Sequence, residues 1–343
     1  MKSLSDQKLD RLQRIAAHPD FSGTKYRVIR ELGHGGMGTV YLAEDSDLHR
    51  EIAIKVLSPS PNESELARRM VREAQIIARL EHPGIVPVHD VGALVDGRVF
   101  YAMKLVRGER LDQYAATVSS IKERLRKFQA ACDAVSFAHA HGVIHRDLKP
   151  QNIMIGAFGE VLVLDWGVAK LFPNSLAERN ASEAETLRLP SRAQQDPEPE
   201  DPDDTTHGTI IGTAKYMSPE QERGEIKQLN ERSDVYSLGA ILYFLLTNRA
   251  PAAVKPRVVN DKVSKAAEAV CLKAMSASSE DRYATAAELA ADVARLLNDE
   301  PVSAYRENWF EKVQRWISKN RVLVLIVLAY LLMRIFFIIS AQG

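Results

Sequence analysis

The segment VIHRDLKPQN, residues 143–152, brings three chemically different polar side chains close together in the chain. Asp147 offers a carboxylate that can act as a base, Lys149 offers a cation, and Asn152 offers a neutral oxygen ligand. A base, a cation and a neutral oxygen ligand are thus gathered within one short segment. Several independent residue identities must coincide in the segment, which makes it the strongest chemical signal in the chain.

A glycine-rich segment, LGHGGMGTV at residues 32–40, could approach phosphate groups closely. Gly33, Gly35 and Gly38 form a G-x-G-x-x-G pattern, and no side chain separates their backbone from a ligand. The same pattern opens a helix in dinucleotide-binding folds, but here TVYLAE has the composition of a second strand. The glycines are therefore expected to lie in a β-hairpin, and a plain hairpin turn without a ligand is the alternative.

Lys55 ends the strand-like segment IAIK, and an ammonium at the end of a half-buried strand needs an anionic partner. Nucleotide phosphates and the carboxylate of Glu73, on the next predicted helix, would supply two partners. Taken singly, each residue could equally be a surface residue, so the interpretation depends on their occurring together with the other motifs.

Together these motifs resemble those of eukaryotic-type (bacterial Hanks-type) serine/threonine protein kinases, over roughly residues 26–299. The resemblance implies an α+β, two-lobed protein-kinase fold, with a small antiparallel-sheet lobe that carries one helix and a larger, mostly helical lobe. It also implies transfer of the γ-phosphoryl group of ATP to Ser or Thr hydroxyls of protein substrates. Asp147 would accept and orient the substrate hydroxyl, and Lys149 would offset charge on the moving phosphoryl group and favour Ser/Thr over Tyr.

The resemblance further implies two ligand sites. Lys55 and Glu73 would hold the α- and β-phosphates, and Mg²⁺, with Mn²⁺ as a possible substitute, would bind Asn152 and Asp165. The implied ATP-binding residues are Leu32, Gly33, Gly35, Gly36, Gly38, Val40, Ala53, Lys55, Met103 and Asn152.

Trp166 stands between Asp165 and Gly167, where the family usually has Phe. Trp is larger than Phe, and its indole N–H needs a partner when it is buried. In the family this aromatic packs under the helix of the small lobe and helps to set active and inactive states. The change removes no charge from the chemistry, so we expect Trp166 to affect only the balance between these states.

Other residues resemble architectural positions of the family. GTAKYMSPEQ resembles the end of an activation segment, in which Ser218 replaces the usual Ala before Pro and Glu220. By resemblance, Glu220 pairs with Arg282, Asp234 braces the catalytic loop, and Thr213 contacts that loop.

Arg146 resembles the residue that receives an activation-loop phosphate. The candidate acceptors, which the protein could phosphorylate itself, are Thr205, Thr206 and Thr209. A phosphate there could pair with Arg146 and order the loop. The alternative is that these are exposed loop threonines with no regulatory role.

The chain also departs from the family pattern in three places. An acidic, proline-rich insert at about 174–206 lengthens the activation segment, and Lys104 stands at a hinge position where many relatives carry an acid. Only a short stretch separates LLTNRAP from AAEAVCLKAM, where the family usually has a further helix and loops that dock substrates.

Apolar patterns predict the elements that position these motifs. Strands are predicted at 26–32, 38–45, 51–57, 85–92 and 99–106, helices at 63–80 and 121–142, a hairpin at 152–165, and a polar helical extension at 1–24. Two helical stripes are expected to be buried, namely Leu66, Met70, Ala74 and Ile77, and Ile121, Leu125, Phe128, Cys132 and Val135.

Bulk composition sets wider limits. The chain has 343 residues, of which 45% are hydrophobic, enough for one large or two small cores. Lys plus Arg and Asp plus Glu number 45 each, so net charge gives no support to a nucleic-acid partner, and we expect none. The two cysteines, Cys132 and Cys271, lie far apart, have no metal-ligand spacing and fit a reducing compartment.

The C-terminal run at 322–339 is apolar except for Tyr330 and Arg334, and could cross a bilayer as a slightly short helix. Basic residues and two tryptophans precede it, namely Trp309, Lys312, Arg315, Trp316, Lys319 and Arg321. This arrangement predicts a single-pass C-terminal anchor with the kinase domain in the cytoplasm. A buried core helix and an interfacial helix are the alternatives.

The predicted organisation follows from these features. It comprises an N-terminal extension (1–25), a kinase domain (26–299, with lobes at about 26–107 and 108–299), a basic juxtamembrane segment (300–321) and a transmembrane helix (322–340). Pairing of small lobes in a homodimer is a further possibility. A pseudokinase would have lost the lysine or one of the two aspartates, and a small-molecule phosphotransferase would lack the SPE element. The chain keeps all of these.

Overall fold

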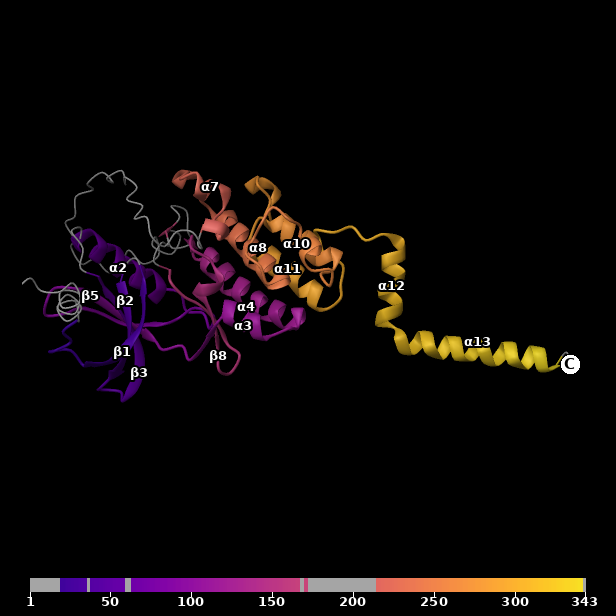
Figure 1. The fold of residues 1–343 in the computed structure, drawn as a ribbon, viewed down its shortest axis with the longest axis horizontal. Coiled ribbons are helices and arrows are strands. Elements are labelled where there is room, and N and C mark those ends of the chain that lie inside the picture. The colour runs from indigo at the N-terminus through magenta and orange to yellow at the C-terminus, as the bar shows by residue number, and fades with distance from the viewer. Residues whose placement is uncertain (1–18, 36–37, 59–62, 167–169, 172–213, 342–343) are drawn as a thin grey trace, which may run out of the picture.

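The computed structural model describes residues 19–35, 38–58, 63–166, 170–171 and 214–341, which form two lobes and a C-terminal helical arm (Figure 1). The strands are β1 (Tyr26–Gly35), β2 (Gly38–Asp45), β3 (Arg50–Leu57), β4 (Val88–Ala93), β5 (Val99–Lys104), β6 (Gly108–Arg110), β7 (Val143–Ile144), β8 (Ile153–Gly156), β9 (Val161–Val163) and β10 (Lys170–Leu171). The α-helices are α2 (Glu63–Ala78), α3 (Leu111–Thr117), α4 (Ile121–Ala140), α7 (Pro219–Glu222), α8 (Glu231–Thr247), α9 (Pro256–Val259), α10 (Lys265–Ala274), α11 (Ala286–Leu297), α12 (Trp309–Lys319) and α13 (Arg321–Ala341). Short 3-10 turns are η1 (Pro150–Asn152), η2 (Ala214–Tyr216), η3 (Ile226–Gln228) and η4 (Ser279–Asp281).

The small lobe is an antiparallel sheet of order β1-β2-β3-β5-β4, with α2 packed on one face. Successive side chains of β3 point to opposite faces of the sheet. Ile52, Ile54 and Val56 belong to the cluster on the face away from α2, whereas Leu57 packs with Met70 of α2. Lys55 shares the α2 face, and this alternation turns its ammonium toward the interior.

The large lobe is built around two long helices that are buried along most of their length. Ser120 caps α4 by accepting a hydrogen bond from the backbone N–H of Glu123, and Asn230 caps α8 in the same way. The α8 helix ends at Asn248, whose φ of 58° is left-handed and stops the helix. The predicted stripes on α2 and α4 are confirmed, because Met70, Ala74, Ile77, Leu125, Phe128, Cys132 and Val135 are buried and Leu66 and Ile121 are partly buried.

A small sheet, β6-β8-β9, lies at the start of the large lobe and connects to the small one. Ile85, in the segment before β4, forms a parallel bridge with Val163 of β9, and the Val163 N–H donates to the Gly84 carbonyl at 2.8 Å. The prediction that the fourth strand begins at residue 85 is therefore wrong. Ile85 pairs with the other lobe, the Pro87 carbonyl accepts the N–H of Lys104 in β5 at 3.0 Å, and β4 begins only at Val88.

The two-lobed α+β prediction is confirmed, but parts of it are not. Residues 19–24 form turns rather than a helix, and Phe21 is buried against Phe100 with ring centroids 5.8 Å apart. Residues 1–18 and the acidic insert at about 174–206 lie outside the described residues. Between α8 and α10 the structure has only the one-turn helix α9, which agrees with the short spacing in the sequence.

The chain leaves the large lobe through α12 and α13, which extend away from it (Figure 1). Within the part of the chain that the structure describes, no helix has both the length and the apolar character required to cross a membrane. The side chains of residues 335–341, at the end of the predicted span, lie outside the described ones.

Candidate active site

The glycine-rich hairpin joins β1 and β2, as predicted from the absence of a helix after the first strand. Gly33 pairs with Val40, and Gly35 pairs with Gly38. A Cβ on Gly38 would lie 2.2 Å from the Val56 carbonyl oxygen, so this position needs glycine for strand packing. Gly33 faces open space, which leaves its backbone accessible. Gly36, predicted to bind ATP, lies outside the described residues.

Lys55 connects the two lobes. Its Nζ lies 3.2 Å from Oε1 of Glu73 on α2 and 3.0 Å from Oδ1 of Asp165, which follows β9. The Tyr101 hydroxyl donates to the same Glu73 oxygen at 2.8 Å, whereas Oε2 of Glu73 is buried without a partner among the described residues. The structure therefore brings three of the predicted residues together, although 110 positions separate Lys55 from Asp165.

The pKa values of this cluster favour its charged form. Burial acts to lower the pKa of Lys55, but Tyr101, Asp165 and Glu73 outweigh burial, and the net pKa is raised. Burial acts to raise the pKa of Asp165, but the charge and hydrogen bond of Lys55, with smaller effects of His145 and Lys149, lower it overall. A cation and an anion are thus held ionised where the two lobes meet.

The catalytic-loop residues converge on Asp147. Lys149 Nζ lies 2.8 Å from Oδ2 of Asp147, and Asn152 Nδ2 donates to the Asp147 carbonyl at 2.8 Å and to Oδ2 at 3.1 Å. The Pro150–Asn152 turn η1 makes this possible by folding Asn152 back over the loop. Asp147 and Lys149 remain partly exposed, with side-chain exposures of 25% and 20%, so a substrate hydroxyl can reach them.

Asn152 and Asp165 fit a hard divalent cation. Both Asn152 amide hydrogens point to Asp147, so its Oδ1 is left as an acceptor, and the Leu164 N–H donates to the Asn152 carbonyl at 2.8 Å beside Asp165. The described residues contain no group of three or more His, Cys, Asp or Glu that could hold a metal. Bound phosphates would have to complete the coordination, as is usual for Mg²⁺.

Asp234 braces the catalytic loop, as predicted. It is 1% exposed, and its carboxylate accepts the backbone N–H groups of His145 at 2.7 Å and Arg146 at 2.9 Å. His139 Nε2 lies 2.8 Å from the same carboxylate. Burial acts to raise the pKa of Asp234, but the His139 hydrogen bond leads the effects that lower it overall. The brace holds Arg146 at a φ of 70°, which is unfavourable for a residue with a Cβ.

His145 is fixed by two further bonds. Its Nε2 lies 2.9 Å from the Leu164 carbonyl, which can only accept, so Nε2 carries a proton. Its Nδ1 then accepts the backbone N–H of Asp147 at 3.3 Å. The imidazole thus connects the backbone of the Asp147 loop to the segment that carries Asp165.

Trp166 is fully buried, and its indole N–H has a partner. Nε1 donates to the Val163 carbonyl at 3.3 Å, and the ring lies 4.6 Å from the His145 ring, between centroids. It belongs to the same buried cluster as Ile77 of α2. The larger aromatic is therefore accommodated, while the neighbouring Asp165 stays in contact with Lys55.

The remaining predicted nucleotide residues lie on the strands around Lys55. Val40 pairs with Lys55 across β2 and β3, and Ala53 pairs with Met103 across β3 and β5. The period of two puts Ala53 and Lys55 on one face of β3. Leu32, beside the hairpin, is 40% exposed.

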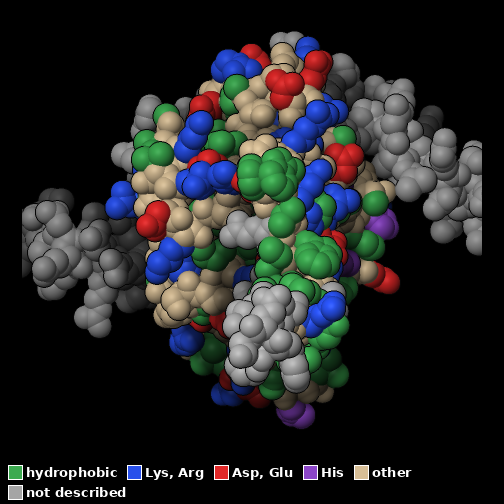
Figure 2. All heavy atoms as spheres, turned by 90° about the vertical axis from the view of Figure 1, so that its right-hand side faces the viewer, with side chains coloured by type: hydrophobic (Ala, Val, Ile, Leu, Met, Phe, Trp, Pro, Cys, Tyr) green, Lys and Arg blue, Asp and Glu red, His purple; other side chains and the backbone are tan. Residues whose placement is uncertain are grey.

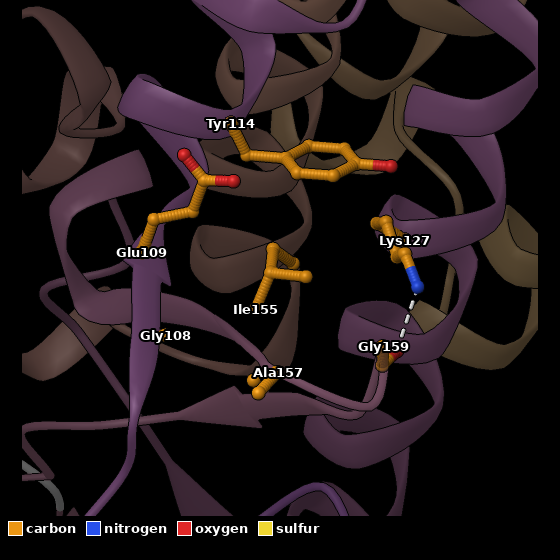
Figure 3. Close-up of a pocket in the computed structure, with 8 residues that line it drawn as sticks. Gly108, Glu109, Tyr114, Lys127, Ile155, Ala157 and Gly159 are labelled. Carbon is orange, nitrogen blue, oxygen red and sulfur yellow. Dashed lines mark hydrogen bonds between the residues drawn. The ribbon is translucent and has the colours of Figure 1, made fainter.

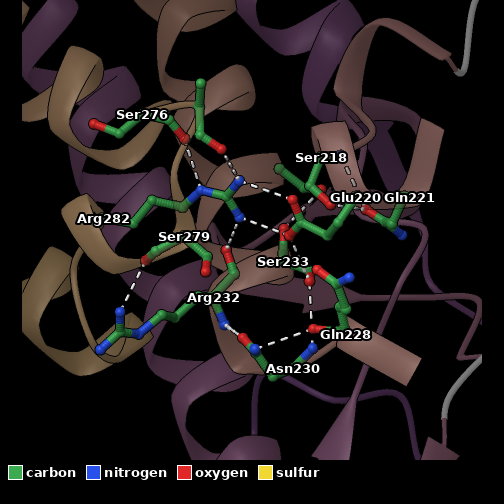
Figure 4. A network of polar contacts seen from close by, with 12 residues as sticks. Ser218, Glu220, Gln221, Gln228, Asn230, Arg232, Ser233, Ser276, Ser279 and Arg282 are labelled. Atoms are coloured by element: carbon green, nitrogen blue, oxygen red, sulfur yellow. Dashed lines mark hydrogen bonds and ion pairs between the residues drawn. The ribbon is translucent and has the colours of Figure 1, made fainter. Parts of the chain in front are cut away.

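Glu220 and Arg282 form the predicted ion pair, shown in Figure 4. Arg282 Nη1 and Nη2 reach the two carboxylate oxygens at 2.7 and 2.9 Å. Its other three donors reach the carbonyl oxygens of Ser276, Arg232 and Ala277. All five guanidinium donors are therefore used, which is what a buried Arg requires. Burial acts to raise the pKa of Glu220, but the bonds from Arg282, its own backbone and Ser233 lower it to about 2.

Several contributors were missed from the sequence. Tyr101 and His139 bond to Glu73 and Asp234, and Gln221 Nε2 donates to the Arg146 carbonyl at 2.7 Å. No local pattern marks the first two, whereas Gln221 directly follows the SPE motif. Thr205, Thr206, Thr209 and Thr213 lie outside the described residues.

Two pockets lie away from this site. One, of about 380 Å³, is lined by residues of β6, β8, α3 and α4, where Lys127 Nζ donates to the Gly159 carbonyl at 2.6 Å (Figure 3). The other, of about 590 Å³, is lined by the end of α2, the segment that follows it, Lys104 and the β8–β9 turn. No predicted catalytic, nucleotide or metal residue lines either pocket.

Comparisons with known proteins agree with this geometry. The model of the protein kinase domain family matches residues 26–303. The serine/threonine-protein kinase PknB of Mycobacterium tuberculosis is 36% identical over 313 residues, which cover 83% of this chain and 45% of the relative. PknD of Protochlamydia amoebophila, another serine/threonine-protein kinase, is 38% identical over 242 residues, which cover 66% of this chain and 23% of the relative.

The chain thus spans less than half the length of these curated relatives. Among solved structures, the PknI kinase domain of Mycobacterium tuberculosis superposes with a TM-score of 0.58 and 26% identity, over 81% of this chain and 98% of that chain. The family match covers most of the chain and includes every residue of the site built above. The chain therefore belongs to the protein kinase domain family.

Proposed function

We propose that this protein is an ATP-dependent serine/threonine kinase that transfers the γ-phosphoryl group of ATP to Ser or Thr hydroxyls of protein substrates. The observation that carries the proposal is the position of Lys55, within 3.2 Å of Glu73 and 3.0 Å of Asp165. The helix of the small lobe and the metal-binding segment of the large lobe are thereby held together through one ammonium. That arrangement is the one phosphoryl transfer requires.

Each residue has a role that its geometry permits. Lys55, fixed by Glu73, binds the phosphates, and Asn152 and Asp165 offer oxygens to a divalent cation, for which we propose Mg²⁺ with Mn²⁺ as a substitute. The bound cation supplies neutralisation of phosphate charge. Asp147 orients the substrate hydroxyl and takes its proton, while Lys149, 2.8 Å away, stabilises negative charge on the transferred group.

We also propose regulation by autophosphorylation at Thr205, Thr206 or Thr209. Support comes from Arg146, whose Nε is buried and has no hydrogen-bond partner among the described residues. Burial lowers the pKa of this guanidinium despite the opposing charge of Asp234, so a second anion would stabilise it. A phosphate is the anion that suits the planar fork of Arg.

We place the kinase domain at 26–299, the juxtamembrane segment at 300–321 and a membrane tether at 322–340, with the kinase domain in the cytoplasm. Support for the tether comes from α13, whose exposed side chains include Val322, Leu325, Ile326 and Leu332. A helix that is apolar on all sides is stable when lipid or a protein core surrounds it. Flotation of the full chain with lipid vesicles tests the tether, and recovery of all protein in the vesicle-free fraction would exclude it.

The test of the activity compares the full chain with its Asp147→Asn variant, each with ATP and Mg²⁺ and a generic Ser/Thr peptide. We expect phosphate incorporation by the wild type and a rate about 10²- to 10⁴-fold lower in the variant, because the proton acceptor is lost. ATP binding should persist in both proteins. A wild type that binds ATP but transfers no phosphate would overturn the proposal in favour of a pseudokinase.

A further inference from the structure

The helix α12 carries an apolar face that stays exposed among the residues that the structure describes. Residues at positions i, i+1, i+4, i+7 and i+8 lie on one side of a helix. The members of this face, with their exposed fractions, are Trp309 (64%), Phe310 (67%), Val313 (45%), Trp316 (55%) and Ile317 (42%). Two exposed tryptophans on one helix face are a large apolar patch for a protein in water.

The charges of α12 are divided between its two sides. Glu311 lies opposite the apolar face. Its carboxylate forms an ion pair with Lys265 of α10 at 2.7 Å and accepts a hydrogen bond from the Tyr305 hydroxyl at 3.0 Å. Arg315 pairs with Glu307 at 2.8 Å. Lys312 and Lys319 lie along one edge of the apolar face, and within the described residues neither makes an ion pair. The cations that remain available are therefore beside the aromatic residues.

The large lobe holds α12 so that this face points away from it. Asp292 of α11 is fully buried and accepts the Ser303 N–H at 2.9 Å and the Ser303 hydroxyl at 2.7 Å, which fixes the segment before α12. The Lys265–Glu311 pair then fixes the opposite side of the helix. These two contacts, one before α12 and one on the side of the helix opposite the apolar residues, leave the apolar face turned outward.

The same face looks in the direction taken by α13. In Figure 1, α12 runs across the line of α13. Figure 2, viewed from the α13 side, shows hydrophobic side chains in the middle of this end of the molecule, with Lys and Arg side chains on both sides of them. A helix lying in the plane of a membrane, followed by one that enters it, has this arrangement.

We propose that α12 lies in the interface of an anionic lipid membrane, with Trp309 and Trp316 at the level of the headgroups and Lys312 and Lys319 on lipid phosphates. The α13 helix favours lipid over a partner protein, because apolar side chains are exposed all around it and a protein groove would cover one side. The proposal rests on the membrane tether proposed above, but not on the kinase activity. Its consequence is that the large lobe faces the membrane in one orientation, set by Lys265 and Asp292.

The test places a polarity-sensitive dye at one of two exposed valines in the full chain, through Val313→Cys or the control Val95→Cys. Val95 is 73% exposed on the small lobe, and the native thiols, Cys132 and Cys271, are buried, so the dye reacts at the new cysteine. The proteins are reconstituted in vesicles of phosphatidylcholine and phosphatidylglycerol. We expect a blue-shifted emission at position 313 that brominated lipid chains quench, and an aqueous emission at position 95.

A second arm tests the charges. Lys312→Glu combined with Lys319→Glu should shift the ratio of immersed to exposed dye at position 313 toward water by about 30-fold or more. Replacing the anionic vesicles with vesicles of phosphatidylcholine alone should also shift the dye at position 313 toward water. The control reverses two exposed arginines of the small lobe, Arg30→Glu and Arg68→Glu, and should leave the ratio unchanged.

Each contrary result has a distinct meaning. An aqueous emission at position 313 in protein that floats with the vesicles would overturn the proposal and leave the tether intact. A blue shift without lipid that grows with protein concentration would overturn it in favour of a second copy of the chain on this face. Failure to float with any vesicle would overturn the tether and this proposal together. Phosphoryl transfer, assayed on the same vesicles, reports separately on the kinase proposal.

Discussion

At the scale of single residues, the site depends on side chains whose backbones are held in unfavourable conformations. Arg146 and Asp165 have φ values of 70° and 56°, in the left-handed region that costs energy for residues with a Cβ. Asp234 holds the first through the backbone N–H, and Lys55 contacts the carboxylate of the second. Such conformations persist only where the surroundings fix them, and they concentrate at functional sites.

Trp166→Phe tests whether the larger aromatic is a packing feature or a catalytic one. The change removes the hydrogen bond to the Val163 carbonyl and leaves a cavity, so the free energy of unfolding should fall by about 1–3 kcal/mol. Because no charge is lost, phosphoryl transfer should stay within about tenfold of wild type. Denaturant unfolding and a kinase assay measure the two effects, and a much larger loss of activity would show that Trp166 itself maintains the active geometry.

Glu220→Gln should reveal a stability that depends on pH. The folded-state pKa of Glu220 is lowered to about 2, so its contribution is fully present above the unfolded pKa of about 4.3 and is lost as pH falls through about 2. At pH 7 the variant leaves Arg282 buried without its anion and should lose about 3–5 kcal/mol of unfolding free energy.

The measurement is denaturant unfolding of both proteins between pH 7 and pH 2, in which the difference should shrink as pH falls. Glu225→Gln is the control, because its pair with Arg223 is largely exposed and should matter little at any pH. A difference that stays constant down to pH 2 would refute the role assigned to the Glu220 charge.

At the scale of elements, the small lobe depends on how closely β2 and β3 approach each other. Gly38 pairs with Leu57, and its Cα faces the Val56 carbonyl without room for a side chain. The same pairing sets the register that puts Val40 opposite Lys55. A residue at the end of the hairpin therefore controls the alignment of the strand that carries the central ammonium.

Gly38→Ala and Gly33→Ala compare a glycine that strand packing requires with a glycine whose Cα faces open space. A Cβ at position 38 would lie 2.2 Å from a backbone oxygen, so the free energy of unfolding should fall by about 1–3 kcal/mol. A Cβ at position 33 meets no atom within 4 Å, so stability should be almost unchanged. Thermal unfolding of both variants measures the two effects. An equal loss of stability in both would show that Gly38 does not pack closely against β3.

At the scale of the whole molecule, the lobes are joined by a strand bridge, an ion pair and a buried cluster that contains both Ile77 of α2 and Trp166. The β9 strand reaches Gly84 and Ile85, and Lys55 reaches Asp165. The arm contacts the large lobe through the Lys265–Glu311 pair. The segment that ends at Ala304 contacts the large lobe more closely, because the backbone N–H groups of Ser303 and Ala304 bond to buried Asp292.

A chain that ends at Arg306 should therefore keep the kinase domain intact. We expect phosphorylation of a soluble peptide within about threefold of the full chain, because the arm contributes no residue to the site. The free energy of unfolding should change by less than about 1 kcal/mol, the usual limit for an exposed ion pair such as Lys265–Glu311. Peptide kinase assays and unfolding curves measure both, and a large loss of either would show that α12 supports the large lobe.

The sequence by itself determined the features that follow from local patterns. The two-residue period predicted β2, β3 and β5 closely, and the helical stripes identified Met70 and Phe128 as core residues, because burial of alternate or every third to fourth residue is a local property. The chemical roles of Asp147, Lys149 and Asn152 could also be predicted from the sequence, because the three residues lie within one short loop.

Only the tertiary structure decided which distant residues meet. Tyr101 bonds to Glu73 and His139 bonds to Asp234, and nothing near these residues in the sequence marks the contacts. Ile85 lies in a segment of strand-like composition, but it forms a bridge with Val163 of β9 in the other lobe. A buried polar group must find its hydrogen-bond partner among the elements that pack against it. Packing brings together segments that are far apart in the sequence, so a local pattern does not identify these partners.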